Sequence, residues 1–312
     1  MSSLSESLDN STSKKSLGLA IGGHRGLSIL QNLIKSSDYR ISWILIPDTL
    51  ESVPESLALL PSPIKPFRIN KSVELENISQ KITSVDILIC AGFPFKLPKS
   101  ILNKVSTIGI NCHGGKLPSY RGGSPIMWQI INDEEFITLT IHELSSEFDE
   151  GDILLESSLL NDKALYIREV QEIVNQEFVR MLDIFLKNPE QYIAKKRAQD
   201  SSKARYWHQR RDVDGFIDWQ RMNASKIYNF VRALATPYPG ARSVLCDGEL
   251  LRIWQVEKDE VPICGSPGRI VKLSDGLHVT TCDDSSIRLV KFGCSRKIRN
   301  GEYMFNHKVG VL

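Results

Sequence analysis

The sequence predicts an α/β protein made of a doubly wound parallel sheet followed by a smaller β-domain. Short apolar runs alternate with helical patterns through the first part of the chain, which is typical of a parallel sheet covered by helices. After residue 206 the pattern changes to many short strands separated by turns, which indicates a small β-barrel. The length of 312 residues is sufficient for two domains.

Composition excludes several classes of protein. The hydrophobic content of 41% and charged content of 24% fit an ordinary globular protein, and the net charge of +2 gives no strong global attraction to nucleic acid or membranes. No apolar run approaches the roughly 18–20 residues that cross a bilayer. Residues 1–14 are polar and Ser-rich, and they lack the apolar core of a signal peptide. We therefore expect a disordered tail and a cytoplasmic location.

The six cysteines do not indicate a disulfide framework or a zinc site. None of them forms a C-x-x-C pair, and several lie in apolar runs. We expect reduced, mostly buried thiols. Cys112 lies between two polar residues and is a candidate nucleophile, but strand alternation points it to the opposite face of its strand.

The first strand pattern, residues 17–21, leads into the turn GGHRG at 22–26 and a helix at 27–35. This order opens a doubly wound fold and faces the helix N-terminus toward the ligand edge. The turn lacks the G-x-G-x-x-G spacing of a dinucleotide site. His24 and Arg25 are candidates for contact with an acceptor's phosphates, and two solvated side chains in a capped turn are the other interpretation.

A strand is expected at 41–46, a Pro- and Ser-rich loop at 47–66, a helix at 73–82 and a strand at 85–90. The loop carries charge of one sign between residues 47 and 64. It contains no Lys or Arg there, whereas Asp48, Glu51 and Glu55 are acidic. Such a loop would repel a phosphate backbone.

The central stretch, 105–154, contains the candidate catalytic residues. A strand pattern ends in Asn111-Cys112-His113, and a glycine-rich loop follows at 114–123. Because residues two apart on a strand face the same side, Asn111 and His113 should project together at the carboxyl edge of the sheet, where ligands bind. Ser124-Pro125 reads as an N-cap and first helical residue for a helix to residue 132.

A further strand is expected at 136–144, followed by an acidic loop that contains Asp149. The amide of Asn111 is suited to donate to a developing oxyanion, and the imidazole of His113 can move a proton near neutral pH. A carboxylate such as Asp149 can orient that imidazole or raise its pKa. These groups favour transfer at a carbonyl centre, against the alternative of a strand end, a satisfied loop histidine and a solvated aspartate. No metal is indicated, because the histidines lack ligand spacing.

The remaining chain divides into a helix, a linker and the β-domain. A helix at 165–186 shows apolar residues at helical spacing, and these predict a packing stripe: Ile167, Val170, Ile173, Val174, Phe178, Met181, Leu182 and Phe185. Residues 195–205 form the expected linker between a domain at 15–194 and one at 206–312. The second domain is expected to hold a helix at 224–234 and five strands, at 243–246, 250–256, 268–273, 276–281 and 287–292.

The stretches INCHGGKLPSYRGGSPIMWQIINDEE and LTIHELSSEFDEGDIL resemble the signature of 10-formyltetrahydrofolate-dependent formyltransferases. That signature is N-x-H, a linker ending in L-P, then Y-R-G, a helix, and D-x-G before an I-L pair. The segments RRDVDGFIDW and PYPGA resemble the carboxyl-terminal domain of the same family. The resemblance covers nearly the whole chain beyond the tail. It implies a Rossmann-like formyltransferase domain followed by a β-barrel related to the oligonucleotide/oligosaccharide-binding (OB) fold.

The resemblance also implies roles for individual residues. Asn111, His113 and Asp149 match the catalytic positions, and 10-formyltetrahydrofolate is the implied formyl donor. The positions that resemble pterin-binding ones are Phe95, Lys96, Leu97, Gly123, Ser145, Ser146, Glu147 and Phe148. Core packing is the alternative reading for the apolar residues of this set. The candidates for substrate contact are Lys116, Tyr120 and Arg121, together with the two residues of the first glycine turn.

Three branches of this family differ in the acceptor. Members that act on initiator methionyl-tRNA have a Lys- and Arg-rich loop where this chain has its acidic one, and residues 209–241 look more like the branch that formylates nucleotide-linked amino sugars. We therefore expect an amino-sugar acceptor, with methionyl-tRNA formyltransferase and 10-formyltetrahydrofolate hydrolase as alternatives. Sugar-acting relatives are often dimeric, so a homodimer is a further expectation. Lys116 and Gly123 depart from the usual family pattern.

Overall fold

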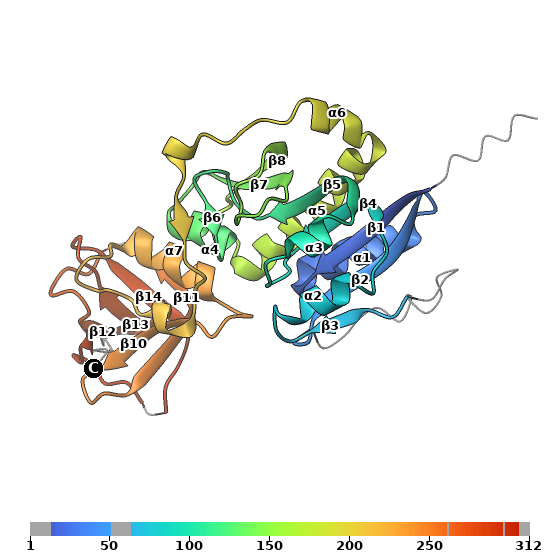
Figure 1. Ribbon diagram of the computed structural model, residues 1–312. Helices are drawn as coiled ribbons and strands as arrows, with labels where there is room; N and C mark the ends of the chain where they lie inside the picture. The colour runs from blue at the N-terminus through green and yellow to red at the C-terminus, as the bar shows by residue number, and fades with distance from the viewer. Residues whose placement is uncertain (1–13, 51–63, 261, 296, 306–312) are drawn as a thin grey trace, which may run out of the picture. The chain divides into compact units, whose positions relative to one another are not determined.

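The computed structural model describes residues 14–50, 64–260, 262–295 and 297–305. Packing divides the chain into two compact units. The first contains Met1–Cys112 and His142–Glu147, and the second contains His113–Ile141 and Phe148–Leu312. Each unit is described by itself (Figure 1).

The first unit is an α/β arrangement with parallel strands. In chain order its elements are β1 (Lys15–Ile21), α1 (Gly23–Lys35), β2 (Tyr39–Pro47), β3 (Phe67–Ile69), α2 (Glu74–Ser79), β4 (Val85–Ala91), α3 (Lys99–Leu102) and most of β5 (Val105–His113). Strand β1 pairs in parallel with β2 and β4, and β4 pairs in parallel with β5. The predicted doubly wound α/β fold is confirmed.

Strand alternation explains why helices cover both faces of these strands. Helices α2 and α3 share one apolar cluster with residues such as Leu45 and Leu88. Helix α1 packs along β1 and β4 (Figure 1). Strand β1 also needs a glycine at position 18 to pack against β2, because a Cβ there would lie 2.3 Å from the indole of Trp43. Burying a large apolar side chain such as that of Trp43 contributes on the order of 2 kcal/mol to folding stability.

In the second unit, the elements before the β-domain are β6 (Arg121–Gly122), α4 (Pro125–Ile131), β7 (Phe136–Glu143, which ends in the first unit), β8 (Ile153–Leu160), α5 (Ile167–Lys187), α6 (Pro189–Ala194) and β9 (Tyr206–Trp207). The order of the seven-stranded sheet is β3-β2-β1-β4-β5-β7-β8. Helix α5 buries the predicted stripe with one exception. Ile173 lies on its flank and is 42% exposed, so its predicted burial is wrong.

The carboxyl-terminal part is a six-stranded sheet in the order β12-β13-β14-β11-β10-β15. Its elements are α7 (Ala224–Leu234), β10 (Ala241–Leu245), β11 (Leu250–Lys258), β12 (Ile270–Leu273), β13 (Gly276–Thr280), β14 (Ser286–Gly293) and β15 (Met304–Phe305). Helix α7 packs on β11, and its apolar face joins the core of the sheet. The small antiparallel β-domain is confirmed, and only the two-residue β15 was not predicted.

Several expected boundaries are wrong. Helix α1 begins at Gly23 and not at residue 27, so His24 and Arg25 lie in its first turn. Ser124 occupies the N-cap position of α4 with φ 51°, but it makes no side-chain cap. Its hydroxyl instead accepts a hydrogen bond from the backbone N–H of Arg210, at 3.1 Å. Residues 1–13 of the expected tail and residues 51–63 of the Pro- and Ser-rich loop at 47–66 lie outside the described residues.

None of the six cysteines, all of which lie in the described residues, forms a disulfide, but they are not mostly buried as expected. Cys90 and Cys112 are buried, whereas Cys246, Cys264 and Cys282 are exposed. The exposed three lie in the connections between strands. Among the described residues, no helix is both long enough and apolar enough to span a membrane.

Candidate active site

Strand β5 carries both Asn111 and His113, and strand alternation places them on one face. Cys112 lies between them and faces the other way. Burial raises the pKa of its thiol to about 12, so the thiol stays protonated and a nucleophilic role is not supported. The carbonyl oxygen of Cys112 accepts a hydrogen bond from Nη1 of Arg25 at 3.0 Å, which ties the end of β5 to helix α1.

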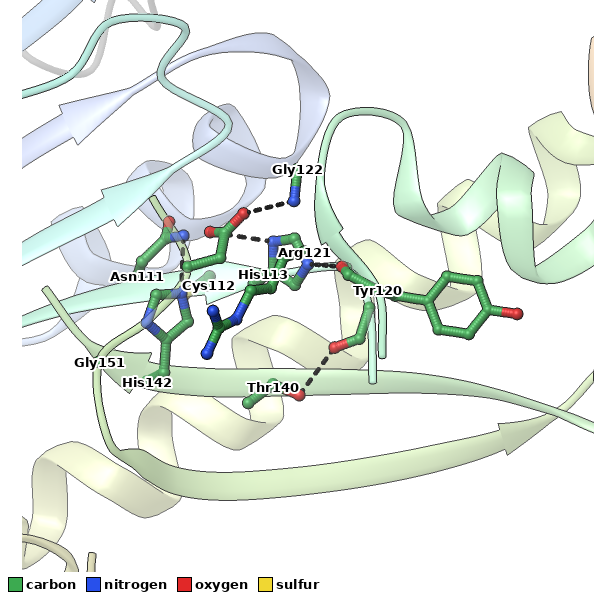
Figure 2. Close-up of polar contacts among 12 residues, drawn as sticks. Asn111, Cys112, His113, Tyr120, Arg121, Gly122, Thr140, His142 and Gly151 are labelled. Carbon is green, nitrogen blue, oxygen red and sulfur yellow. Dashed lines mark hydrogen bonds and ion pairs between the residues drawn. The ribbon is translucent and has the colours of Figure 1, made fainter. Parts of the chain in front are cut away.

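A second histidine orients the Asn111 amide. Nδ2 of Asn111 lies 3.1 Å from Nε2 of His142, on β7 (Figure 2). The other ring nitrogen, Nδ1, lies 2.9 Å from the carbonyl oxygen of Glu143 and must donate to it, because a carbonyl only accepts. In the neutral ring Nε2 is therefore an acceptor, and one N–H of Asn111 donates to it. Sequence reasoning assigned no role to His142.

His113 is buried and lies between two oxygen acceptors. Its Nε2 is 2.6 Å from the carbonyl oxygen of Tyr120, and its Nδ1 is 3.4 Å from Oδ1 of Asp149 (Figure 2). A ring with an acceptor beside each nitrogen suits the protonated imidazole, in which both nitrogens donate. His113 and Asp149 are 6% and 9% exposed, so their interaction is only weakly screened by water.

Asp149 connects the histidine to the glycine-rich loop. Its second oxygen, Oδ2, accepts a hydrogen bond of 2.8 Å from the N–H of Gly122. The backbone of Asp149 is left-handed, with φ 56°. For a residue other than glycine this conformation costs on the order of 1 kcal/mol, although aspartate tolerates it better than most. Contacts around the turn must therefore hold it in place.

The turn after His113 is fixed by two buried side chains that sequence reasoning missed. Nε2 of Gln129, on α4, donates to the carbonyl of Gly114 at 2.9 Å. The hydroxyl of Thr140, on β7, donates to the carbonyl of Gly115 at 2.8 Å (Figure 2). Gly115 has to be small, because an added Cβ would lie 2.8 Å from Nε2 of His113.

The residues predicted to contact the substrate differ in their exposure and in how many protein groups they already contact. Lys116 and His24 are exposed. Tyr120 is buried, and its hydroxyl donates to Glu134 at 2.5 Å. Burial, helped by that neighbouring carboxylate, raises the pKa of Tyr120 to about 12. Arg121 is 3% exposed and binds protein partners, including Glu150 at 3.0 Å. These placements favour structural roles for Tyr120 and Arg121, and their contact with substrate stays a prediction.

The predicted folate residues comprise packed and accessible side chains. Leu97 is buried in the apolar cluster of the first unit, and Phe95 packs edge to face on Phe93 with 5.5 Å between ring centres. Nζ of Lys96 pairs with Glu147 at 3.4 Å. Ser145 donates to the carbonyl of Glu147 at 2.9 Å, which shapes the loop.

The rest of this set lies at the surface or against backbone. Ser146 is exposed, and Phe148 is 56% exposed, which is unusual for a phenylalanine and makes it accessible to a ligand. An added Cβ at Gly123 would lie 2.5 Å from Cα of Gln209. This position therefore has no room for a side chain in the observed arrangement.

Residues 197–209, which we name the brace, run along the loops of the candidate site. The predicted linker supplies most of them. Arg197 forms a two-way backbone bridge with Ile153, at 2.8 and 2.9 Å. Strand β9 pairs in parallel with β6 in the glycine-rich loop, and the N–H of Gly123 donates to the carbonyl of Trp207 at 2.8 Å. The predicted domain limits stay a prediction, but this stretch is not a free tether.

Two family models match the chain. Residues 55–177 match "Formyl transferase", and residues 211–308 match "Formyl transferase, C-terminal domain". A methionyl-tRNA formyltransferase of Caldanaerobacter subterraneus subsp. tengcongensis is 28% identical over 261 residues, which cover 80% of this chain and 83% of the relative. The bifunctional polymyxin resistance protein ArnA of Wigglesworthia glossinidia brevipalpis is 33% identical over 214 residues, which cover 66% of this chain and 31% of the relative.

Solved structures share the fold at lower identity. WlaRD, described as a sugar 3N-formyl transferase, superposes with a TM-score of 0.64 at 16% identity, covering 91% of this chain and 99% of that one. An N-formyltransferase from Helicobacter canadensis superposes with a TM-score of 0.65 at 14% identity, covering 88% of this chain and 98% of that one. With both family models matched in order along the sequence, the chain belongs to the formyl transferase family.

Proposed function

We propose that this protein transfers a formyl group from 10-formyltetrahydrofolate to the amino group of a nucleotide-linked amino sugar. The observation that carries the formyl-transfer part is the buried His113–Asp149 pair next to Asn111 on the same strand. An amide donor and an imidazole with a carboxylate partner are the groups that acyl transfer to an amine requires.

In the proposed reaction, the uncharged acceptor amine attacks the formyl carbon, and a tetrahedral oxyanion forms. Asn111 donates an amide N–H to the oxyanion. The protonated imidazole of His113 gives its proton to the leaving folate nitrogen. Asp149 receives the proton that the amine loses and returns it to His113. The bond from carbon to folate nitrogen breaks, and the formamide and tetrahydrofolate leave.

The choice of acceptor rests on charge. Residues 47–64 contain no Lys or Arg, and the neighbouring Arg68 lies near Asp48, with 3.9 Å between Nη1 and Oδ1. Arg68 also donates to the carbonyl of Leu50 at 3.0 Å. A loop with this charge offers little to a tRNA backbone. The structure of the Helicobacter canadensis relative was solved with folinic acid and dTDP-3-aminofucose, which makes dTDP-linked amino sugars the first probes.

Methionyl-tRNA formylation is the second candidate, because relatives at 28% and 29% identity carry that name. A hydrolase that transfers the formyl group to water is the third. The cytoplasm is the proposed location, since the proposed donor and acceptors are charged, water-soluble molecules.

The test follows release of tetrahydrofolate from 10-formyltetrahydrofolate by purified protein. It is run with no acceptor, with nucleotide-linked 3-amino and 4-amino sugars carrying dTDP, UDP or GDP, and with charged initiator tRNA. Acceleration by one sugar supports the proposal and names the substrate. Acceleration by the tRNA alone, weakening steeply as salt rises, replaces the acceptor with methionyl-tRNA. Fast release with no acceptor makes the protein a hydrolase.

A further inference from the structure

Gln199, in the brace, makes four hydrogen bonds around the turn that carries Asp149. Its Oε1 accepts from Nε and Nη2 of Arg121, at 3.0 and 2.9 Å. Its Nε2 donates to the carbonyl oxygens of Asp149 and Gly151, at 2.8 and 2.7 Å. The partners fix the direction of the amide, because a flipped amide would place an oxygen against two carbonyls and an NH₂ group against a guanidinium.

These bonds hold both ends of the Asp149–Gly151 turn with one NH₂ group. Arg121, which completes the arrangement, also reaches the middle of the turn. Its Nη1 donates to Glu150 at 3.0 Å and to the hydroxyl of Tyr206 at 2.9 Å. Arg121 is 3% exposed, so it is a fixed support for the glutamine.

We infer that Gln199 is a positioning residue for Asp149 and, through it, for His113. The inference rests on the proposed catalytic roles of those two residues. Asp149 has a left-handed backbone, and its carboxylate has to reach Gly122 with Oδ2 and His113 with Oδ1. The two carbonyl bonds from Gln199 hold that backbone from the brace side against relaxation.

The first test is kinetic. Gln199→Met keeps the length of the side chain and removes all four bonds, and Gln199→Glu keeps the acceptor for Arg121 but removes both donors. We expect kcat to fall by about tenfold to a hundredfold in each, which is the effect of misplacing a catalytic group by a fraction of an ångström to one ångström. KM should change by less than about threefold, because the lost interaction acts on the chemical step. The matched control is Gln220→Met, at an exposed glutamine with one long contact of 3.4 Å to Pro267.

A double-mutant cycle separates positioning from general destabilisation. Asp149→Asn removes the carboxylate through which Gln199 is inferred to act. Adding Gln199→Glu to Asp149→Asn should then lower kcat by less than about twofold, since residues that act as a unit are not additive. If kcat in the double variant falls by the full product of the two single-variant losses, the inference is wrong.

The second readout does not depend on activity. The carbon-bound ring protons of His113 are followed by NMR from about pH 5 to about pH 9 in wild type, Gln199→Met and Gln220→Met. A carboxylate nearby favours the protonated ring, so the midpoint should fall in Gln199→Met and stay in the control. An unchanged midpoint in folded Gln199→Met overturns the inference. If wild type formylates no acceptor, the proposed function fails, and this titration still decides the role of Gln199.

Discussion

At the scale of single residues, a neighbouring histidine sets the orientation of the Asn111 amide. It has two N–H groups, and the bond to Nε2 of His142 uses one of them. The same bond sets the plane of the amide, so the N–H groups of Asn111 have fixed directions. A preset donor of this kind needs no reorganisation when charge develops on the substrate.

Replacing Asn111 by alanine removes that donor. We expect kcat for formyl transfer to fall by about 10²–10³, the usual loss for one oxyanion donor. The melting temperature should remain close to that of wild type, because the residue is only partly buried. Turnover and thermal unfolding are measured together, with the exposed Asn103→Ala as control. Near-normal turnover in Asn111→Ala would falsify the catalytic assignment.

Gly115 gives a second prediction at this scale. A methyl group there meets Nε2 of His113 at 2.8 Å, and the ring has to move away from Tyr120 and Asp149. Gly115→Ala should therefore lower kcat about tenfold or more while the protein still folds. The control is Gly215→Ala, where the nearest atoms to a new Cβ lie at 3.5 Å. Equal activity in the two variants would show that His113 does not need its observed position.

At the scale of elements, helix α7 is held by a buried arginine. Nη1 of Arg232, which is 0% exposed, donates to the carbonyls of Asp162 and Leu165 at 2.9 and 2.6 Å. Its Nη2 donates to Asn161, and its Nε donates to Asn229 at 3.0 Å. Burial lowers the pKa of Arg232. The guanidinium satisfies acceptors that would otherwise be buried without partners.

Arg232→Lys keeps the charge but supplies fewer donors in a different geometry. At least one buried acceptor then loses its bond, which costs about 1–3 kcal/mol of unfolding free energy. Chemical denaturation of the variant and wild type measures the difference. Arg221→Lys, at a side chain that is 79% exposed, should change stability by less than about 0.5 kcal/mol. Equal stabilities for Arg232→Lys and wild type would contradict the proposed anchoring role.

Sequence reasoning succeeded where an effect is local and failed where segments far apart in the chain meet. The N-x-H pair at the end of β5 follows from strand alternation alone. The bounds of α7 also follow from local signals, including Asn223, whose side chain accepts from the N–H of Lys226. The partners of Gln199 and Gln129 depend on which loops come together, and no spacing in the sequence encodes that.

At the scale of the whole molecule, one histidine makes stability depend on pH. His278 is 3% exposed and lies 3.0 Å from both Asp259 and Asp275. Burial alone would lower the pKa of His278, but its hydrogen bonds to the two carboxylates outweigh burial and raise it above the ordinary value of 6.5. The folded state therefore binds the proton more tightly than the unfolded chain.

The stabilisation from protonated His278 should be complete below pH about 6.5 and should be lost as pH rises through the folded-state pKa. Urea unfolding of wild type and His278→Gln, at pH about 6 and about 9, measures it. The difference in unfolding free energy between wild type and His278→Gln should be larger at the lower pH. His208→Gln, at an exposed histidine, is the control for loss of an imidazole outside the core. A gap for His278→Gln that does not change with pH would disprove the assignment.

The brace also fixes the order in which a newly made chain acquires its site. Ribosomes release the amino-terminal part first, and folding proceeds as segments emerge. A nascent chain that has reached Ala194 already contains Asn111, His113 and Asp149, but it lacks Gln199 and the strand that pairs with β6. The loops around Asp149 can therefore gain the contacts of the brace only after residues 197–209 have been translated.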